Sequence, residues 1–495
     1  MISVLLLVAF FITLLVYITF WYWRIINHWS RRLVMGPKPH WLYGNLDGLR
    51  KQQSLNDIFD GCYQQFQGHS VRLLGVYLFV WPGVLVTDRH LAKRILTKDF
   101  RNFRNRGMYH NTEDLSGNLF THDYEKWRMF RTKLSSSFSN FKLKAMLPTF
   151  VKASQELIYV MEKDLELGNP TLDIKDLMLR FTIEIIATCA FGLQTNSLRN
   201  PNCAFAQITE KANIGEDTSI LAKFIMLCFP NVARILRLRY MPQYMVELYI
   251  DMVRNILELR SQHKIRYNDI MDTLNDMRLE APSKLSLKEM AAQTLIFFQA
   301  GYETSAYTLT YALYELAHRE EVQQKARLEI LKTLDKYNNK LTYECLGEMV
   351  YLEQIINETL RLYPASPLII RQCTEDYRVA GTENISIDKG QMVIIPVYSL
   401  QRDKRYYSHP NNFNPDNFRP DSIDSESILS FGDGPRNCIG RRFAKMQITV
   451  GLIDLLRKFK FQICESTPNP IEFKNSSVLL SPKNEIYLKV EKIQN

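Results

Sequence analysis

Apolar residues recur at intervals of three and four along most of this chain, which is the periodicity of helices with a buried face. The longest such stretch, Leu287–His318, is preceded by Ser286, and Glu289 follows at the spacing of a capping box. The pattern predicts a mainly α fold with a small β-rich part. The predicted helices are Leu91–Leu96, Lys142–Leu165, Leu172–Gly192, Val246–His263, Leu287–His318, Tyr351–Leu362 and Arg441–Leu456.

A few segments are instead rich in β-branched residues and bounded by turn-forming residues, which predicts strands. Two of them, Val71–Val76 and Val80–Val86, lie near the front, with a break predicted at Pro82 and Gly83. A hairpin is predicted over Ile385–Val397, turning at residues 388–390. No internal repeat and no shift in composition divides the chain, so we expect a single large domain.

The N-terminal 23 residues predict a transmembrane anchor. Residues 2–23 carry no charged side chain, and a helix over Val4–Trp23 is about 30 Å long, enough to cross a bilayer. The positive charges come afterwards, which places the rest of the chain on the cytosolic side. A cleaved signal peptide would instead begin with positive charge and end in small residues.

A basic and proline-rich linker is predicted over residues 24–39, because the prolines of Gly36-Pro37-Lys38-Pro39 prevent a helix from continuing. Residues 40–495 then form the predicted main domain. Within it, the apolar segment at residues 220–230 is either a buried helix or a second contact with the membrane.

Composition narrows the class of protein. With 495 residues, of which 46% are hydrophobic, the chain can bury a large core. The net charge of +10 is spread along the chain, which suits anionic lipid or an acidic partner and resembles no nucleic-acid-binding motif. Eight scattered cysteines without a C-x-x-C pair argue against zinc and thioredoxin chemistry and fit a reducing compartment.

The most informative segment is Phe431–Gly440, with the sequence F-G-D-G-P-R-N-C-I-G. Its glycines let the backbone approach a flat ligand closely, and loop N–H groups and a following helix N-terminus are expected to lower the pKa of the Cys438 thiol. Arg436 suits a carboxylate. Two other interpretations are a phosphate-binding loop, for which the third glycine is missing, and a buried structural cysteine.

The run Ala300-Gly301-Tyr302-Glu303-Thr304 is unusual inside a long apolar helix, because glycine costs about 1 kcal/mol there and a buried acid needs a partner. One interpretation is a kink at which the Thr304 hydroxyl bonds a preceding carbonyl. The functional interpretation is a groove at Gly301 that leaves room for dioxygen and water, to which Glu303 and Thr304 relay protons.

Two pairs of residues share a helix face. Glu358 and Arg361 predict an ion pair, which is worth little if solvated and much if buried. Trp127 and Arg131 present indole and guanidinium donors that suit a carboxylate, with stacking on a surface helix as the alternative.

Taken together, these patterns resemble the motifs of the cytochrome P-450 family of haem-thiolate monooxygenases, and the resemblance extends from about Gly36 to the C-terminus. It implies that Cys438 is the axial ligand of haem b, that Thr304 and Glu303 are catalytic, and that a buried Glu358–Arg361 pair braces the haem loop. The residues that it implies for cofactor binding are Trp127, Arg131, Ala300, Gly301, Arg371, Phe431, Arg436 and Gly440.

The segment Pro415–Phe418 departs from the family pattern P-E-R-F, in which an arginine often joins the helical ion pair. Asn417 stands at that position. It can donate a hydrogen bond but brings no charge, and Arg419 is the alternative partner.

The resemblance implies an enzyme that inserts one oxygen atom of O2 into a lipophilic small molecule, using electrons from NADPH through a flavoprotein reductase, with cytochrome b5 as a further donor. It also implies a single-pass protein of the endoplasmic reticulum membrane with its catalytic domain on the cytosolic face. The C-terminal third looks like the insect detoxification branch, so xenobiotic or endogenous lipid and hormone metabolism is expected. Basic side chains that predict an electron-donor docking face, or else an ordinary solvated face, are Lys126, Arg128, Lys133, Arg441, Arg442 and Lys445.

Three alternatives keep less of this chemistry. A haem-thiolate isomerase or dehydratase needs no reductase and tends to lack the acid–threonine pair. A non-catalytic membrane haem carrier or sensor needs no proton relay, and a membrane-anchored helical scaffold binds no cofactor. The sequence does not specify the substrate, although a lipophilic pocket or core packing accounts for Phe297, Phe298, Leu368, Ile369 and Leu479.

Overall fold

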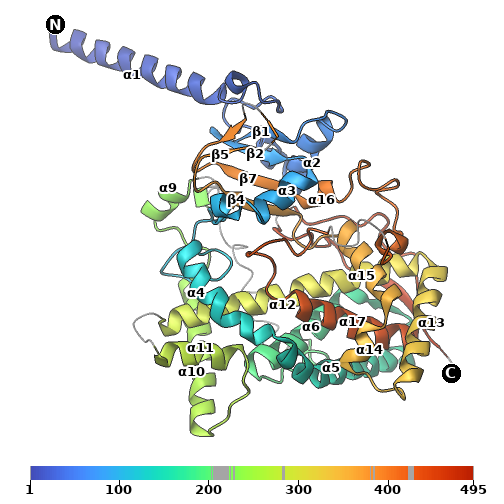
Figure 1. Cartoon of the computed structure of the whole chain (residues 1–495). Helices are drawn as coiled ribbons and strands as arrows, with labels where there is room; N and C mark the ends of the chain where they lie inside the picture. Colours follow the sequence, from blue (N-terminus) through green and yellow to red (C-terminus); the bar gives the residue numbers. More distant parts are fainter. Residues whose placement is uncertain are drawn as a thin grey trace.

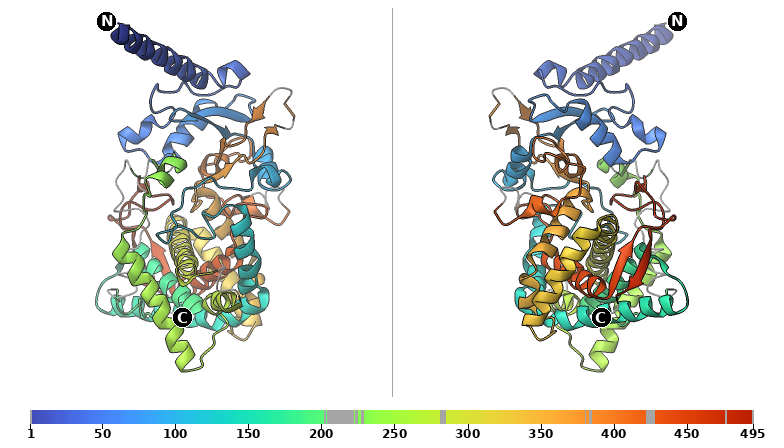
Figure 2. Two further views of the ribbon diagram at one scale, coloured as in Figure 1. Left: turned by 90° about the vertical axis from the view of Figure 1, so that its left-hand side faces the viewer. Right: turned by 90° about the vertical axis from the view of Figure 1, so that its right-hand side faces the viewer.

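The computed structural model describes residues 2–201, 203, 222, 225–226, 229–280, 285–379, 381–382, 385–421, 428–475 and 477–493. A long N-terminal helix projects from a small β-rich part, and a larger helical part lies beyond it (Figure 1). Both side views show the same order, with the β-rich part between the N-terminal helix and the helical part (Figure 2). Most of the predicted apolar segment at residues 220–230 lies outside the described residues.

The helices are α1 (Ile2–Ile26), α2 (Leu55–Gln65), α3 (Arg89–Leu96), α4 (Tyr124–Leu134), α5 (Asn140–Glu166), α6 (Ile174–Phe191), α9 (Pro230–Ile235), α10 (Gln243–Gln262), α11 (Ile270–Glu280), α12 (Leu287–Ala317), α13 (Glu320–Lys336), α14 (Tyr343–Gly347), α15 (Val350–Leu362), α16 (Val397–Leu400) and α17 (Arg441–Lys458). The strands are β1 (Leu73–Leu78), β2 (Trp81–Val86), β3 (Thr171–Asp173), β4 (Leu368–Gln372), β5 (Tyr377–Arg378), β6 (Ser386–Ile387), β7 (Met392–Pro396), β8 (Phe459–Gln462) and β9 (Tyr487–Lys492).

Helix α12 is the centre of the helical part. It packs against α6, α10, α15 and α17, and most of its side chains are buried in the main hydrophobic core. Its predicted capping box is present, since the Ser286 hydroxyl accepts from the Glu289 N–H at 3.2 Å and Glu289 accepts from the Ser286 N–H at 2.9 Å. The predicted helices are confirmed, except that residues 171–173 form β3 before α6 begins.

The largest sheet has the strand order β1-β2-β7-β4, and it corrects two predictions. The first hairpin turns at Phe79 and Val80, because Pro82 pairs with Tyr77 inside β2. Pro82 is tolerated there because the pairing of β2 with β7 starts only at Gly83, so that no ladder bond is lost.

The predicted hairpin over Ile385–Val397 is also wrong. A turn does occur at residues 388–390, but β6 pairs with β5 in a separate two-stranded sheet, whereas β7 pairs with β2 and β4. Local turn residues predicted the reversal correctly, while the choice of strand partners depends on segments that are distant in sequence.

The segment that follows α1 is attached to the sheet. The Trp29 side chain is buried, and its indole N–H donates to the Val76 carbonyl at 3.1 Å. A side chain at Gly75 would overlap the Trp29 ring, so glycine is required for this contact. The Gly75 N–H also donates to the Met35 carbonyl at 2.8 Å. The predicted linker is therefore attached to β1 of the main domain through Trp29 and Met35.

Helix α1 is long and apolar enough to cross a membrane, and none of its apolar window over Val4–Ile26 is buried against the protein. It runs three residues beyond Trp23, the predicted end of the anchor. Apart from Ile26 at its end, which packs against the core of the β-rich part, most of these apolar side chains are exposed, and a membrane is the environment that would bury them.

Candidate functional site

The Cys438 loop is a tight backbone ring that ends where α17 begins. The Cys438 N–H donates to the Phe431 carbonyl at 2.8 Å, and the Asn437 N–H donates to Gly434 at 3.1 Å. Gly432 and Gly434 both have a φ of +68°, which favours glycine. A side chain at Gly434 would also lie 1.8 Å from the Leu96 carbonyl oxygen. These glycines are therefore dictated by the shape of the loop.

Cys438 is exposed although its thiol is surrounded by protein, which indicates an accessible internal space beside the sulfur. The residue is solvent-accessible, yet burial by the surrounding protein raises the pKa of its thiol. The Gly440 N–H and the positive charges of Arg131, Arg441 and Arg106 act in the opposite direction and favour the thiolate. The lowered pKa expected from the sequence is thus not reached, because desolvation outweighs the loop amides and the arginines.

The other described cysteines differ from Cys438. None of the seven described cysteines forms a disulfide, and burial raises the pKa of Cys62 to about 11 and that of Cys373 to about 12. No cationic side chain counteracts burial at either thiol. A raised thiol pKa leaves little reactive thiolate at these two cysteines near neutral pH.

Four arginines gather around the same internal space without carboxylate partners. Arg106 interacts electrostatically with Arg131, Arg371 and Arg436, and of the four only Arg106 and Arg131 act on Cys438. None of the four forms an ion pair with a described carboxylate, although Asp123 acts on Arg436 from a longer distance. Burial, followed by repulsion between the arginines, lowers the pKa of Arg106 to about 10 and that of Arg436 to about 9. Such a cluster is destabilising unless an anion lies between its members.

The hydrogen bonds of these arginines are incomplete. Arg371 and Arg436 are buried, and the Nε atoms of both and the Nη1 atom of Arg436 have no hydrogen-bond partner among the described residues. Arg436 donates once, from Nη2 to the His122 carbonyl at 2.8 Å. Unmatched guanidinium donors next to an accessible thiol fit a large ligand with carboxylates at one edge and a metal at its centre, as haem has.

Trp127 and Arg131 both contact residues of the Cys438 loop. Arg131 donates to the Asn437 carbonyl at 2.8 Å and to the Asn437 side chain at 2.7 Å, next to Cys438. The Arg436 guanidinium lies over the Trp127 ring at 4.5 Å. The stacking considered as an alternative is therefore present, but it involves the buried Arg436 rather than a surface residue.

Arg106 is a site residue that the sequence analysis missed. It belongs to none of the recognised motifs and lies in the loop before α4, where its Nη1 donates to the Phe120 carbonyl at 2.6 Å. Its position beside Arg131, Arg371 and Arg436 is visible only in three dimensions. A basic residue flanked by Asn105 and Gly107 gives no periodicity or spacing by which to find it.

The middle of α12 is accessible at Ala300. Ala300 is exposed although it lies in the interior of a mostly buried helix, and Thr304 is half-buried. The Thr304 hydroxyl donates to the Ala300 carbonyl at 2.8 Å, as the structural interpretation predicted, but α12 continues without a break. The exposed Ala300 and the half-buried Thr304 place a carbonyl and a hydroxyl at this accessible point of the helix.

The predicted groove at Gly301 is wrong. A side chain at Gly301 would lie 2.6 Å from the Cδ1 atom of Ile186, so this glycine lets α12 pack closely on α6. The space that the glycine leaves is occupied by Ile186 and holds no room for small molecules. The exposed residue in this part of α12 is Ala300.

The Glu358–Arg361 pair is fully buried. Arg361 donates to the two carboxylate oxygens at 2.7 and 2.8 Å, and both side chains have 0% exposure. The Asn417 side chain donates to Glu358 at 3.1 Å, whereas Arg419 forms a surface ion pair with Asp416 at 2.6 Å. Asn417 is therefore the third member of the brace, and Arg419 takes no part in it.

Half of the predicted basic docking face is neutralised. Lys126, Lys133 and Lys445 form ion pairs with Glu289, Glu280 and Glu353. Arg128, Arg441 and Arg442 are exposed and form no ion pair with any described residue. Positive charge for an acidic partner is thus concentrated on these three arginines.

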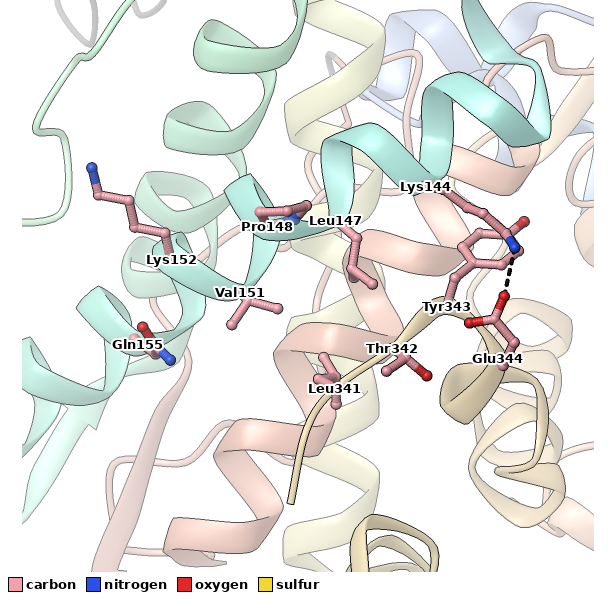
Figure 3. A pocket seen from close by; sticks show the side chains of 10 residues that line it. All are labelled: Lys144, Leu147, Pro148, Val151, Lys152, Gln155, Leu341, Thr342, Tyr343 and Glu344. Atoms are coloured by element: carbon pink, nitrogen blue, oxygen red, sulfur yellow. Dashed lines mark hydrogen bonds and ion pairs between the residues drawn. The ribbon is translucent and has the colours of Figure 1, made fainter. Parts of the chain in front are cut away.

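A separate groove lies between α5 and the segment that leads into α14 (Figure 3). Leu147, Val151 and Leu341 form apolar walls, and the Lys144–Glu344 ion pair lies at one end. None of the residues predicted for the haem site lines this groove, so it is not the site that the motifs describe.

Comparison with known proteins agrees with this geometry. A profile of the cytochrome P-450 family matches residues 34–490. The chain is 40% identical to cytochrome P-450 6a9 of Drosophila melanogaster, over 98% of this chain and 99% of that protein. It is 37% identical to cytochrome P-450 6A1 of Musca domestica, over 94% of each chain. Members of this family bind haem through a cysteine thiolate, and by both measures the chain belongs to the cytochrome P-450 family of monooxygenases.

Proposed function

We propose that this protein is a membrane-anchored monooxygenase in which Cys438 is the axial haem ligand and the substrate is a lipophilic small molecule. The observation that carries the proposal is the accessible Cys438 thiol, deep in the protein and beside four arginines that have no carboxylate partner. Haem, when bound, supplies the redox chemistry of oxygen activation, and thiolate ligation favours O–O cleavage.

The protein groups then have distinct roles. Arg371 and Arg436 bind the propionates with their unmatched donors, with Arg106 beside them. Arg131 fixes the loop through Asn437, and the Gly440 N–H keeps electron density on the sulfur. Phe431 closes the loop through its carbonyl, and the Arg441 guanidinium lies over its ring at 5.7 Å.

We expect Thr304→Ala to lower the yield of product per NADPH by roughly tenfold. Thr304 holds the Ala300 carbonyl at the edge of the site, where it and Glu303 would deliver protons. Loss of one such bond, worth about 1 to 1.4 kcal/mol, corresponds to about fivefold to tenfold in rate. The measurement is product formed against NADPH consumed.

A matched control for Thr304 is available in the same helix. Thr310 makes the same kind of bond, to the Ala306 carbonyl at 2.8 Å, but it is fully buried. Thr310→Ala should leave coupling unchanged. Equal coupling in Thr304→Ala and the wild type would remove Thr304 from the proton path.

An NADPH-dependent flavoprotein reductase is the proposed electron donor, with cytochrome b5 as a second one. Arg128, Arg441 and Arg442 support docking of an acidic surface on the side of α4 and α17, which carry the residues around Cys438. The decisive experiment supplies the purified chain with reductase, NADPH, ¹⁸O2 and a lipophilic substrate such as lauric acid, whose hydroxylated product keeps the inserted oxygen atom. One labelled oxygen atom in the product supports the proposal, whereas turnover without NADPH indicates an isomerase or dehydratase.

The proposed location is the endoplasmic reticulum membrane, with the catalytic domain on the cytosolic face. Deletion of residues 2–23 should release the chain from membranes on carbonate extraction while haem binding is retained, because α1 is not buried against the rest of the protein. Extraction followed by immunoblotting of pellet and supernatant measures this. A truncated chain that stays in the carbonate-resistant pellet would show a second integral contact.

The physiological substrate is proposed to be a xenobiotic or an endogenous lipid or hormone. Leu368 and Ile369 are half-buried on β4, next to the buried Arg371, and they support an apolar wall beside the site. Phe297 and Phe298 are core residues instead, since Phe297 stacks on Phe138 at 5.8 Å and Phe298 contacts Tyr302 at 5.0 Å.

A further inference from the structure

A second cavity lies at the far end of α12 from the accessible Ala300. It measures about 280 Å³ and is formed by the end of α12, the end of α15, α16 and residues 469–473. Tyr314, which lines it, is ten residues beyond Thr304, and this separation is about 15 Å along the helix. None of the residues assigned to the haem site lines this cavity.

The cavity contains an arginine without a partner. The Arg402 guanidinium lies over the Tyr398 ring at 3.8 Å and over the Tyr363 ring at 5.8 Å. It makes no side-chain hydrogen bond or ion pair with any residue that the structure describes, and its Nη1 atom is buried and unmatched. Burial lowers the pKa of Arg402, because a buried charge without a counter-charge is destabilising. An anion bound to Arg402 would therefore stabilise the folded protein.

Besides burial, which lowers the pKa of Arg402, Asp60 raises it and Arg361 lowers it from a distance, but no described carboxylate forms an ion pair with Arg402. Arg319 forms an ion pair with Glu315, and the Tyr363 hydroxyl donates to the other oxygen of Glu315 at 2.5 Å. Glu315 is thus already satisfied by two donors. With His318 neutral, the two arginines and one carboxylate of the lining give the cavity a formal charge of +1, which favours an anionic ligand over a cationic one.

The remaining walls are aromatic. Tyr314, Tyr363 and Phe473 line the cavity, and the Tyr363 ring is held in place by stacking on Tyr311 at 4.5 Å. Asn469 and Pro470 at its edge are exposed, so a ligand can enter from solvent. Rigid rings beside a planar guanidinium suit a flat ligand that carries a carboxylate.

We propose that this cavity binds a small aromatic carboxylate, with the carboxylate on Arg402 and the ring against Tyr363 and Phe473. The site is separate from the haem site and does not depend on the proposed function. Gln401, which directly precedes Arg402, belongs to the brace of the haem loop, because the Gln401 side chain donates to the Arg361 carbonyl at 3.0 Å and to the Ser430 hydroxyl at 3.1 Å. A ligand on Arg402 therefore contacts the residue next to that brace.

The test uses the full-length holoenzyme with its haem iron ligated by clotrimazole, so that the substrate cavity is filled. Titration calorimetry compares benzoate with neutral benzamide. We expect benzoate to bind at least about tenfold more tightly, and Arg402→Gln to remove that difference. Arg419→Gln, which removes the same charge from an exposed surface pair, should leave benzoate binding unchanged.

A second measurement serves if Arg402→Gln fails to fold. Crystals of the wild type soaked in 4-iodobenzoate should show an anomalous iodine peak between Tyr363 and Phe473. An iodine peak elsewhere with none in this cavity would overturn the proposal. So would benzoate binding that is equal to that of benzamide, or that is unaffected by Arg402→Gln.

Discussion

Cys438→His should abolish the red-shifted Soret band that a thiolate-ligated haem gives when the reduced protein binds carbon monoxide, and monooxygenase activity should be lost with it. The reason is that no other described thiol can take its place. Cys438 alone among the described cysteines is exposed, and although burial raises the pKa of its thiol, the Gly440 N–H and three arginines act in the opposite direction. The carbon monoxide difference spectrum measures the result directly.

Two control variants make this result specific. Cys62→Ser and Cys464→Ser change half-buried thiols elsewhere in the protein and should leave the band unchanged. Retention of the band in Cys438→His would refute the ligand assignment. Folded wild-type protein that stays colourless after expression with ample haem would refute the cofactor site as a whole.

The arginine cluster explains why haem binding and folding of this region should be linked. Arg371 and Arg436 keep unmatched donors in a buried place, and the arginines repel one another. A dianionic ligand supplies both the missing acceptors and the missing charge, so binding to the folded state stabilises it by mass action. The loop that presents Cys438 is tied to the same cluster through Arg131 and Asn437.

The parts of the site that the sequence could predict are those fixed by short-range geometry. The Cys438 loop needs glycine at its two positions of positive φ, and α12 begins with a capping box, so both leave local patterns. The spacing of Glu358 and Arg361 predicts an ion pair but does not show whether the pair is buried. The prediction that it is buried rests on the family resemblance. It is confirmed by their 0% exposure.

The parts that could not be predicted depend on segments that are distant in sequence. Arg106 joins the arginine cluster through the fold, without a motif of its own. The role of Gly301 was mistaken because its neighbour is Ile186, on another helix. The pairing of β6 with β7 was predicted wrongly for the same reason, because β7 pairs with the distant strands β2 and β4 and not with β6, its neighbour in sequence.

The brace formed by Glu358, Arg361 and Asn417 links α15 to the segment that leads to the haem loop. Arg361 also donates to the carbonyls of Gln401 and Pro410, at 2.9 and 2.7 Å. Gln401 in turn accepts the Leu429 N–H at 2.9 Å, two residues before the loop begins. Loss of the ion pair is therefore expected to disturb the backbone that positions Cys438.

Glu358→Gln should lower the free energy of unfolding by about 3–5 kcal/mol, because it leaves the Arg361 charge buried without its counter-charge. The amide keeps the size of the carboxylate, so that the change tests charge rather than volume. Urea unfolding followed by tryptophan fluorescence and by the haem Soret band measures it, and we expect haem to be released at lower urea than in the wild type. Asp416→Asn, which breaks the exposed pair with Arg419, is the matched control and should cost about 0–1 kcal/mol. If the two variants lost similar stability, the buried pair would be no stronger than a surface one, and the haem loop would depend on its glycines and on Arg131 instead.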